Sequence, residues 1–195
     1  MSEEIFYHFS LLFNMTNAKT TRRFGALLAF CACVCALFVG SPPSHAYAQE
    51  MPVPVNLHIV LLKKVLSLSK TLQGKQIKVV VVFSDASAAL KDEALNGFLT
   101  IGIQASACKV NQIAKEASNA DVIYIAPGAG VVQKFCEDNG ILSVTGMPSL
   151  VEKGITTVAI GIEAGKPKVF VNLTRAKSEK QEFSSDLFKV ARVFR

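Results

Sequence analysis

The fold of this chain is constrained most by short apolar runs that alternate with helical segments. The first run, residues 77–83, contains four consecutive valines and is bounded by Gly74 and by Ser84 and Asp85. A run that is apolar on both faces is typical of a strand buried in a parallel sheet. Further strands are predicted over residues 99–104, 121–125 and 141–145, with helices over residues 86–96, 110–119 and 130–138.

The alternation changes after residue 145. The next predicted elements are a helical turn, two strands and two helices, at residues 149–153, 157–163, 168–172, 173–180 and 184–194. The turn between the two strands contains Gly165, Lys166 and Pro167, which indicates an antiparallel hairpin. The sequence therefore predicts a three-layer α/β domain with a mainly parallel sheet, ordered βαβαβα and followed by a β-hairpin and a C-terminal helix.

The N-terminal residues have the order of a signal peptide. A basic segment, residues 19–23, precedes an apolar stretch, residues 24–40, and the small residues Ala46 and Ala48 follow. This order predicts a signal peptide over residues 1–48 that is cleaved after Ala48. A membrane anchor is the alternative, but the apolar stretch is near the short limit for spanning a bilayer.

Cleavage would release a mature domain of residues 49–195 into the periplasm. Met15 begins a more usual signal peptide than Met1 does, so the true start of the chain can be Met15. The formal net charge of +6 is modest, and lysine and arginine form no run of five or more. We therefore expect no nucleic-acid partner.

Few residues of the mature domain suit catalysis. His58 is its single histidine and lies in an apolar segment, so we expect a structural role for it. Histidine-rich metal sites and Ser-His-Asp arrangements would need this residue. The glycines near residue 128 lack the third glycine of a dinucleotide fingerprint, and residues 161–166 do not fit a phosphate loop. The sequence predicts no enzyme, no cofactor and no metal.

Two cysteines, Cys108 and Cys136, remain in the mature domain. An even pair in an oxidising compartment is compatible with one disulfide. Two separate buried thiols are the alternative, because free cysteine is among the most buried residue types.

Small polar residues follow the predicted strands and form a candidate ligand crevice. They are Ser84, Asp85, Ser87, Gly128 and Thr145. In open α/β sheets, ligands bind at the carboxyl ends of the strands. The same residue types also serve ordinary turns, which is the structural alternative.

The predicted first helix of the mature domain, residues 55–72, is apolar on most sides. Such a helix is either central to the core or covered by another subunit. We expect it to contact a partner protein or a second copy of the chain through Leu57, Leu61, Lys64 and Leu68.

The chain resembles the YfiR-like periplasmic family, a domain of unknown function, from about Pro54 to Arg195. The most specific part is the C-terminal block, in which residues 169–177 run from a strand into Asn172 and Leu173, and residues 183–193 begin with Phe-Ser-Ser. Residues 121–125 and 141–145 are similar to the two inner strands of that family. Asn172 also lies where strand gives way to helix, and Ser184 is a natural N-cap.

The resemblance implies a periplasmic regulator that inhibits an inner-membrane diguanylate cyclase through its periplasmic part. It would then control cyclic-di-GMP and biofilm formation. The family supplies no catalytic residue. Members with more cysteines than this chain can carry two disulfides, so redox control here would be simpler or missing. A periplasmic small-ligand-binding protein that serves a sensor or transporter is the alternative function.

Overall fold

The structure of the protein is a computed structural model, in which residues 51–195 are described. The predicted signal peptide, with Ala46 and Ala48, lies outside the described residues, so its cleavage stays a prediction. Within residues 51–195, no helix has the length and apolarity needed to cross a membrane.

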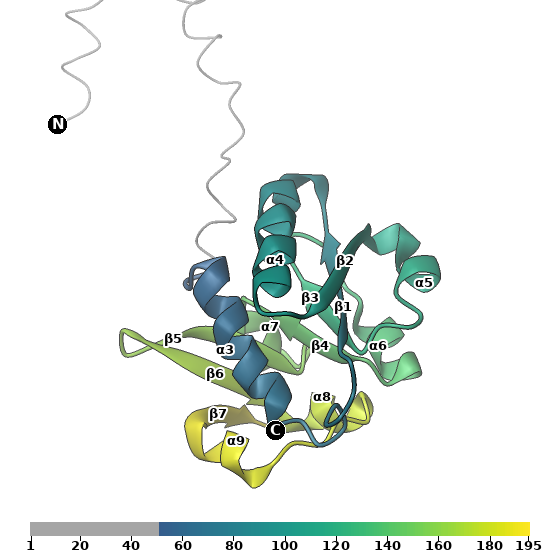
Figure 1. The fold of residues 1–195 in the computed structure, drawn as a ribbon. Helices are drawn as coiled ribbons and strands as arrows, with labels where there is room; N and C mark the ends of the chain where they lie inside the picture. The colour runs from purple at the N-terminus through teal and green to yellow at the C-terminus, as the bar shows by residue number, and fades with distance from the viewer. Residues whose placement is uncertain (1–50) are drawn as a thin grey trace, which may run out of the picture. The chain divides into compact units, whose positions relative to one another are not determined.

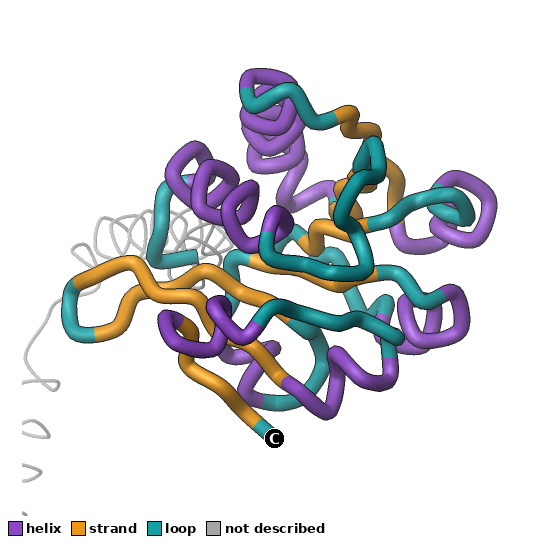
Figure 2. The backbone as a smooth tube through the Cα atoms, turned by 60° about the horizontal axis from the view of Figure 1, so that its bottom comes forward, coloured by secondary structure: helices purple, strands orange, loops and turns teal. Residues whose placement is uncertain are grey.

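A seven-stranded sheet forms the middle layer of the domain (Figure 2). Its strands, in spatial order, are β2 (Gln104–Lys109), β1 (Lys78–Phe83), β3 (Val122–Ile125), β4 (Leu142–Thr145), β5 (Val158–Glu163), β6 (Lys166–Asn172) and β7 (Ala191–Phe194). The first five strands in this order run parallel, β6 pairs antiparallel with β5, and β7 pairs parallel with β6. The predicted α/β class, the mainly parallel sheet and the hairpin are confirmed.

Helices cover both faces of the sheet (Figure 1). One face carries α3 (Val55–Ser67), α4 (Ala88–Thr100) and α9 (Ser185–Val190). The other carries α5 (Ile113–Glu116), α6 (Gln133–Asn139) and α7 (Pro148–Glu152). A further helix, α8 (Leu173–Ser178), follows β6, and the 3₁₀ turns η1 (Asp85–Ser87) and η2 (Val110–Gln112) follow β1 and β2.

The valines of β1 explain why the sheet needs two covering layers. Val79 and Val81 pack into the cluster beneath α3 and α4, whereas Val80 and Val82 pack into the cluster beneath α5 and α6. All four are buried. Burying one such side chain contributes roughly 1.5–3 kcal/mol, so a strand with valine on both faces favours a three-layer arrangement.

The second predicted strand was placed too early. Residues 99–104 were predicted as a strand, but α4 continues through Thr100, and β2 begins only at Gln104. The helix is extended because Phe98 is fully buried and packs edge-on against Tyr124, with ring centroids 5.8 Å apart. Gly102, with a φ of +75°, then turns the chain into β2.

The predicted C-terminal helix is wrong beyond Val190. Residues 191–194 form strand β7, because Phe194 stacks on Phe170 of β6 with ring centroids 6.3 Å apart. Arg192 also pairs with Glu163 at 3.0 Å. Other helices are also shorter than predicted. Helix α3 ends at Ser67, and the predicted helix over residues 110–119 is a 3₁₀ turn followed by the four residues of α5. Helix α6 begins only at Gln133, and α8 ends at Ser178.

Candidate functional site

The predicted crevice at the strand ends is closed at β4. The Thr145 hydroxyl is buried, donates to the Ile125 carbonyl at 3.0 Å and accepts from the Met147 amide at 3.3 Å. Met51 lies directly over the neighbouring Gly146, where a methyl group would overlap the end of the Met51 side chain. The segment that leads into α3 therefore fills the space beside Thr145.

The remaining crevice residues serve their own turns. Ser84 and Ser87 form a capping box around η1, in which the Ser84 amide donates to Ser87 Oγ at 3.0 Å. Asp85 is exposed and pairs with Lys109 at 2.7 Å. Gly128 has a φ of +70° in the turn after β3. These contacts favour the structural interpretation, in which the residues shape turns.

His58 is a buried structural residue, as the sequence predicts. Its Nε2 lies 2.9 Å from the Thr145 carbonyl oxygen, and because a carbonyl only accepts, Nε2 carries the hydrogen. The ring packs edge-on against Tyr124 at 5.4 Å. Burial lowers the pKa of His58 to about 4, and the bond to the Thr145 carbonyl partly opposes this shift. The imidazole is therefore neutral near pH 7.

The two cysteines are free thiols, so the predicted alternative of a disulfide is not present. Cys108 on β2 and Cys136 on α6 are buried in the apolar cluster beneath α5 and α6. Burial raises the pKa of both thiols, which disfavours the reactive thiolate. Their surroundings match the other alternative, two separate thiols in an apolar core.

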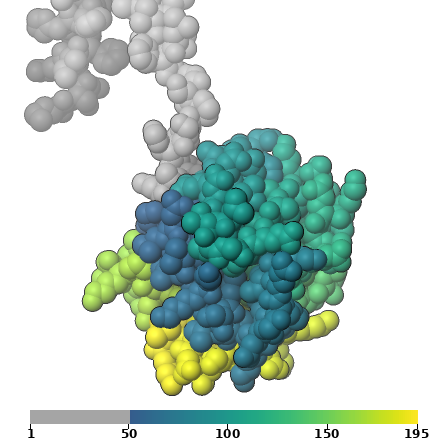
Figure 3. Space-filling view, in the orientation of Figure 1, coloured from purple at the N-terminus to yellow at the C-terminus, as the bar shows by residue number. Residues whose placement is uncertain are grey.

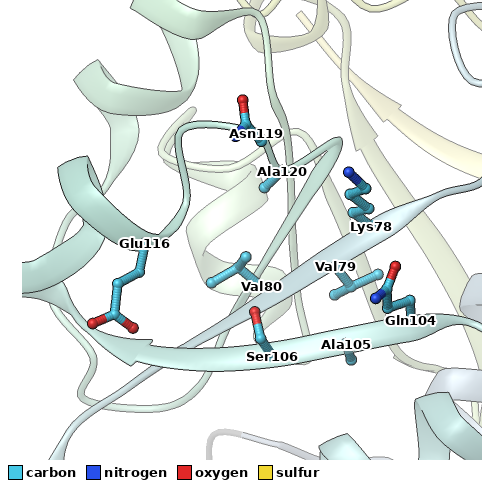
Figure 4. Close-up of a pocket in the computed structure, with 9 residues that line it drawn as sticks. All are labelled: Lys78, Val79, Val80, Gln104, Ala105, Ser106, Glu116, Asn119 and Ala120. Carbon is cyan, nitrogen blue, oxygen red and sulfur yellow. The ribbon is translucent and has the colours of Figure 1, made fainter.

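A first hollow lies at the amino ends of β1 and β2 (Figure 4). It has a volume of about 220 Å³ and is bordered by strand residues such as Lys78 and Ser106 and by Glu116 and Asn119 from the α5 side. Ligands of open α/β sheets bind at the opposite, carboxyl ends of the strands. The hollow is therefore a poor match to the ligand site expected for this fold.

A larger groove lies between α3, β6 and α9 and has a volume of about 390 Å³. In Figure 3, the blue surface of α3 borders the yellow surface of the C-terminal elements. The residues that line the groove are mostly apolar: Leu61, Lys64, Val65, Leu68, Pro167, Lys168, Val169, Asp186, Leu187 and Val190. Three of the four predicted partner-helix residues thus line one groove. The fourth, Leu57, is 43% exposed on α3 but does not line it.

The walls of the groove are firmly anchored. On α3, Ile59, Leu62 and Leu66 are buried against the sheet, and on α9 Leu187 is fully buried. The end of α3 is also joined to the start of α9, because the Lys70 amide donates to the Glu182 carbonyl and the Ser184 amide to the Leu68 carbonyl, both at 2.8 Å. The groove is therefore a preformed feature of the fold.

Charged side chains border the apolar lining of the groove. Lys64 and Lys168 take part in no ion pair within the described part of the chain. The one acidic lining residue, Asp186, pairs with Lys189 at 2.7 Å. The rim is therefore net positive.

A buried polar network centred on Glu179 was missed by sequence reasoning. The Glu179 carboxylate is fully buried and accepts bonds from the Ser143 amide, from the Ser143 and Thr157 hydroxyls at 2.6 Å, and from Arg175 Nε at 3.0 Å. Burial raises the pKa of Glu179, and these donors partly oppose the rise.

The guanidinium of Arg175 extends this network to α6. It donates to the Glu137 carboxylate at 3.1 Å and to the Gln133 carbonyl. The network thus joins the C-terminal end of α8 to α6, to Ser143 on β4 and to Thr157, which directly precedes β5. The i, i+4 spacing of Arg175 and Glu179 was the only sequence signal for it. Within residues 51–195, no group of three histidine, cysteine, aspartate or glutamate residues could hold a metal ion.

Comparisons with known proteins bear on the fold alone. No family model and no curated protein matches the chain, so the YfiR-like resemblance stays a prediction. Two similar solved structures are the ABC domain from Streptococcus pneumonia in complex with L-Trp and a conserved domain protein from Vibrio cholerae, at 13% and 16% identity. Each has a TM-score of 0.53 and aligns over 73% of this chain. The match covers 60% of the length of each of those chains.

Proposed function

We propose that this chain is a non-enzymatic periplasmic regulator that binds and inhibits the periplasmic part of an inner-membrane signalling protein. The partner that the YfiR-like resemblance implies is a diguanylate cyclase, so cyclic-di-GMP and biofilm formation would be the output. The observation that carries the proposal is the apolar groove between α3, β6 and α9.

The groove suits protein binding because its apolar side chains are accessible on rigid walls. Val190 is 55% exposed, and Leu61 and Leu68 are half-buried on the opposite wall. Exposed apolar patches with polar rims commonly mark protein interaction sites. Covering these side chains with a partner would remove apolar surface from water at about 25 cal/mol per Å².

The residues suited to chemistry are committed to the core, which supports a non-enzymatic role. His58 is neutral and bonded to Thr145 inside the domain. Cys108 and Cys136 are buried thiols with raised pKa values. Met51 fills the strand-end crevice beside Gly146.

A small-ligand-binding protein that serves a sensor or transporter is the second candidate. The groove volume of about 390 Å³ is favourable to it, since small-molecule sites occupy roughly 300–1,000 Å³. One structure of similar fold was solved as a complex with L-Trp. In this function the groove would take an apolar ligand in place of a protein segment.

A capture experiment tests the proposal, with the periplasmic region of a membrane diguanylate cyclase immobilised on a support. We expect this region to capture the protein purified after expression of the full chain. Val190→Asp, which puts a charge in the groove, should weaken capture by about tenfold or more, because an unpaired charge would be buried. Val131→Asp is the matched control, since Val131 is 68% exposed and does not line the groove.

Three results distinguish the proposed function from the second candidate. Capture by the wild type and Val131→Asp, with loss in Val190→Asp, supports the proposal. Capture that is equal in all three proteins contradicts the groove as the binding site. No capture, together with calorimetric binding of a small apolar molecule that Val190→Asp weakens, favours the second candidate.

A further inference from the structure

We propose that the groove between α3, β6 and α9 accepts one amphipathic helix whose apolar stripe is flanked by acidic residues. This inference rests on the proposed function, because it names the kind of partner segment that the same groove binds. It follows from the shape of the groove, the pairing of its strand and the charges of its rim.

The length of the groove matches two helical turns. Leu61 and Lys64 line one wall at positions i and i+3 of α3, and Leu68, the C-cap residue of this helix, continues the same wall at i+7. At 1.5 Å per residue, this wall is about 10 Å long. An apolar stripe of similar length on a second helix would contact the wall from end to end.

A partner strand is disfavoured by the pairing of β6. Strand β6 pairs with β5 along almost its whole length and with β7 from Val169 to Asn172. Only its first three residues lie beside no second strand, and one of them, Pro167, has no amide hydrogen to donate. The other two walls are helices, whose backbone hydrogen bonds are internal. Recognition therefore relies mainly on side chains, and a helix presents an apolar stripe of side chains without needing backbone partners.

The charges of the rim select an acidic partner. Lys64 and Lys168 lack ion-pair partners within residues 51–195, and Asp186 is already paired with Lys189. Glutamate or aspartate beside the apolar stripe of the partner would pair with these lysines and steer association. A second copy of the chain is a poorer occupant, because a two-fold contact would bring Lys64 and Lys168 of both copies to the same interface.

Designed peptides test the inference without knowledge of the partner sequence. The first probe is a fluorescent peptide of about 16 residues, long enough to be partly helical, with leucines at i, i+3, i+4 and i+7 and flanking glutamates. A second peptide has lysines in place of the glutamates, and a third has the first composition in scrambled order. Binding to the purified protein is followed by fluorescence anisotropy.

We expect the acidic amphipathic peptide to bind about tenfold or more tightly than either of the other two. The double variant Lys64→Glu and Lys168→Glu should reverse the preference between the acidic and basic peptides. A matched control, Lys115→Glu and Lys153→Glu, changes the net charge equally at exposed sites outside the groove and should leave the preference unchanged.

The inference is overturned if the acidic and scrambled peptides bind equally, or if reversing Lys64 and Lys168 has no effect. A dimer in solution that Val190→Asp dissociates would also overturn it, because a second copy would then occupy the groove. Groove-dependent capture of the cyclase region without charge selectivity would refute this inference and leave the proposed function standing. Selective peptide binding without cyclase capture would support this inference and contradict the proposed function.

Discussion

The residues that shape this domain most are polar groups buried in an apolar interior. His58 is the clearest case, because its Nε2 is bonded to Thr145 while its Nδ1 has no hydrogen-bond partner among residues 51–195. The Tyr124 hydroxyl, on the ring that His58 packs against, also lacks a partner within the described part of the chain. Protonation of His58 would place a charge in this apolar site, which explains the lowered pKa of about 4.

The pKa of His58 makes stability depend on pH. Between pH 6.5 and pH 4 the unfolded chain binds a proton at His58 and the folded chain does not, so this residue makes stability fall as the pH falls. From pH 7.5 to pH 5 the loss amounts to about 2 kcal/mol. Urea unfolding at the two pH values measures it.

His58→Gln is the control for this measurement, since glutamine does not titrate. Glu179 acts in the opposite direction, because its raised pKa favours the folded state as the pH falls. The difference in pH dependence between the wild type and His58→Gln isolates His58. Equal pH dependence in both proteins would show that His58 is not a buried neutral imidazole.

The Glu179 network makes a second prediction at the scale of residues. Glu179→Ala would leave the buried Arg175 guanidinium without its buried carboxylate partner and the Ser143 amide without an acceptor. Removing one member of a buried ion pair costs roughly 3–5 kcal/mol, so the free energy of unfolding should fall by about that amount. Chemical denaturation of Glu179→Ala, with the exposed Glu152→Ala as the control, measures it. A loss below about 1 kcal/mol would contradict the role of the network.

At the scale of elements, close packing around two glycines fixes α7 and the lead-in segment. At Gly161 on β5, a methyl group would overlap the Pro148 ring and lie 2.9 Å from Phe170 Cε2. Both neighbours are rigid. At Gly146, a methyl group would meet the end of the flexible Met51 side chain. The two sites therefore differ in how easily their surroundings can yield.

We predict that Gly161→Ala lowers the free energy of unfolding by about 1–3 kcal/mol through overpacking, and that Gly146→Ala lowers it by less. Denaturant unfolding of the two variants ranks them by their free energy of unfolding. A Gly146→Ala protein that is the less stable of the two would mean that Met51 is held as rigidly as Pro148.

Elements with strong local patterns were predictable from the sequence. The strand at residues 78–83 is defined by its valines. The predicted N-cap at Ser184 and the predicted change from strand to helix at Asn172 are confirmed, since these side chains accept from the Asp186 and Arg175 amides. The elements that were misplaced depend on distant contacts. Residues 191–194 suit a helix locally, and only the stacking of Phe194 on Phe170 and the pairing with β6 make them a strand.

For the whole molecule, the fold class was predictable and the proposed binding groove only in part. Helix α3 was identified from its apolar composition, and Leu61, Lys64 and Leu68 do line the groove. The other walls come from β6 and α9, which are about 100 residues later in the sequence and whose arrangement depends on the strand order. At the predicted crevice the contacts favour the structural alternative, because turns and Met51 use polar and open positions that a ligand would need.

The central claim is that the protein acts on a membrane signalling enzyme through this groove. Cyclic-di-GMP synthesis by a membrane diguanylate cyclase, in vesicles that expose its periplasmic part, tests the claim most directly. The purified protein and Val131→Asp should inhibit synthesis to the same extent, and Val190→Asp should not inhibit at matched concentration. Synthesis that the wild-type protein leaves unchanged, or that Val190→Asp inhibits as fully as the wild type, would contradict the account.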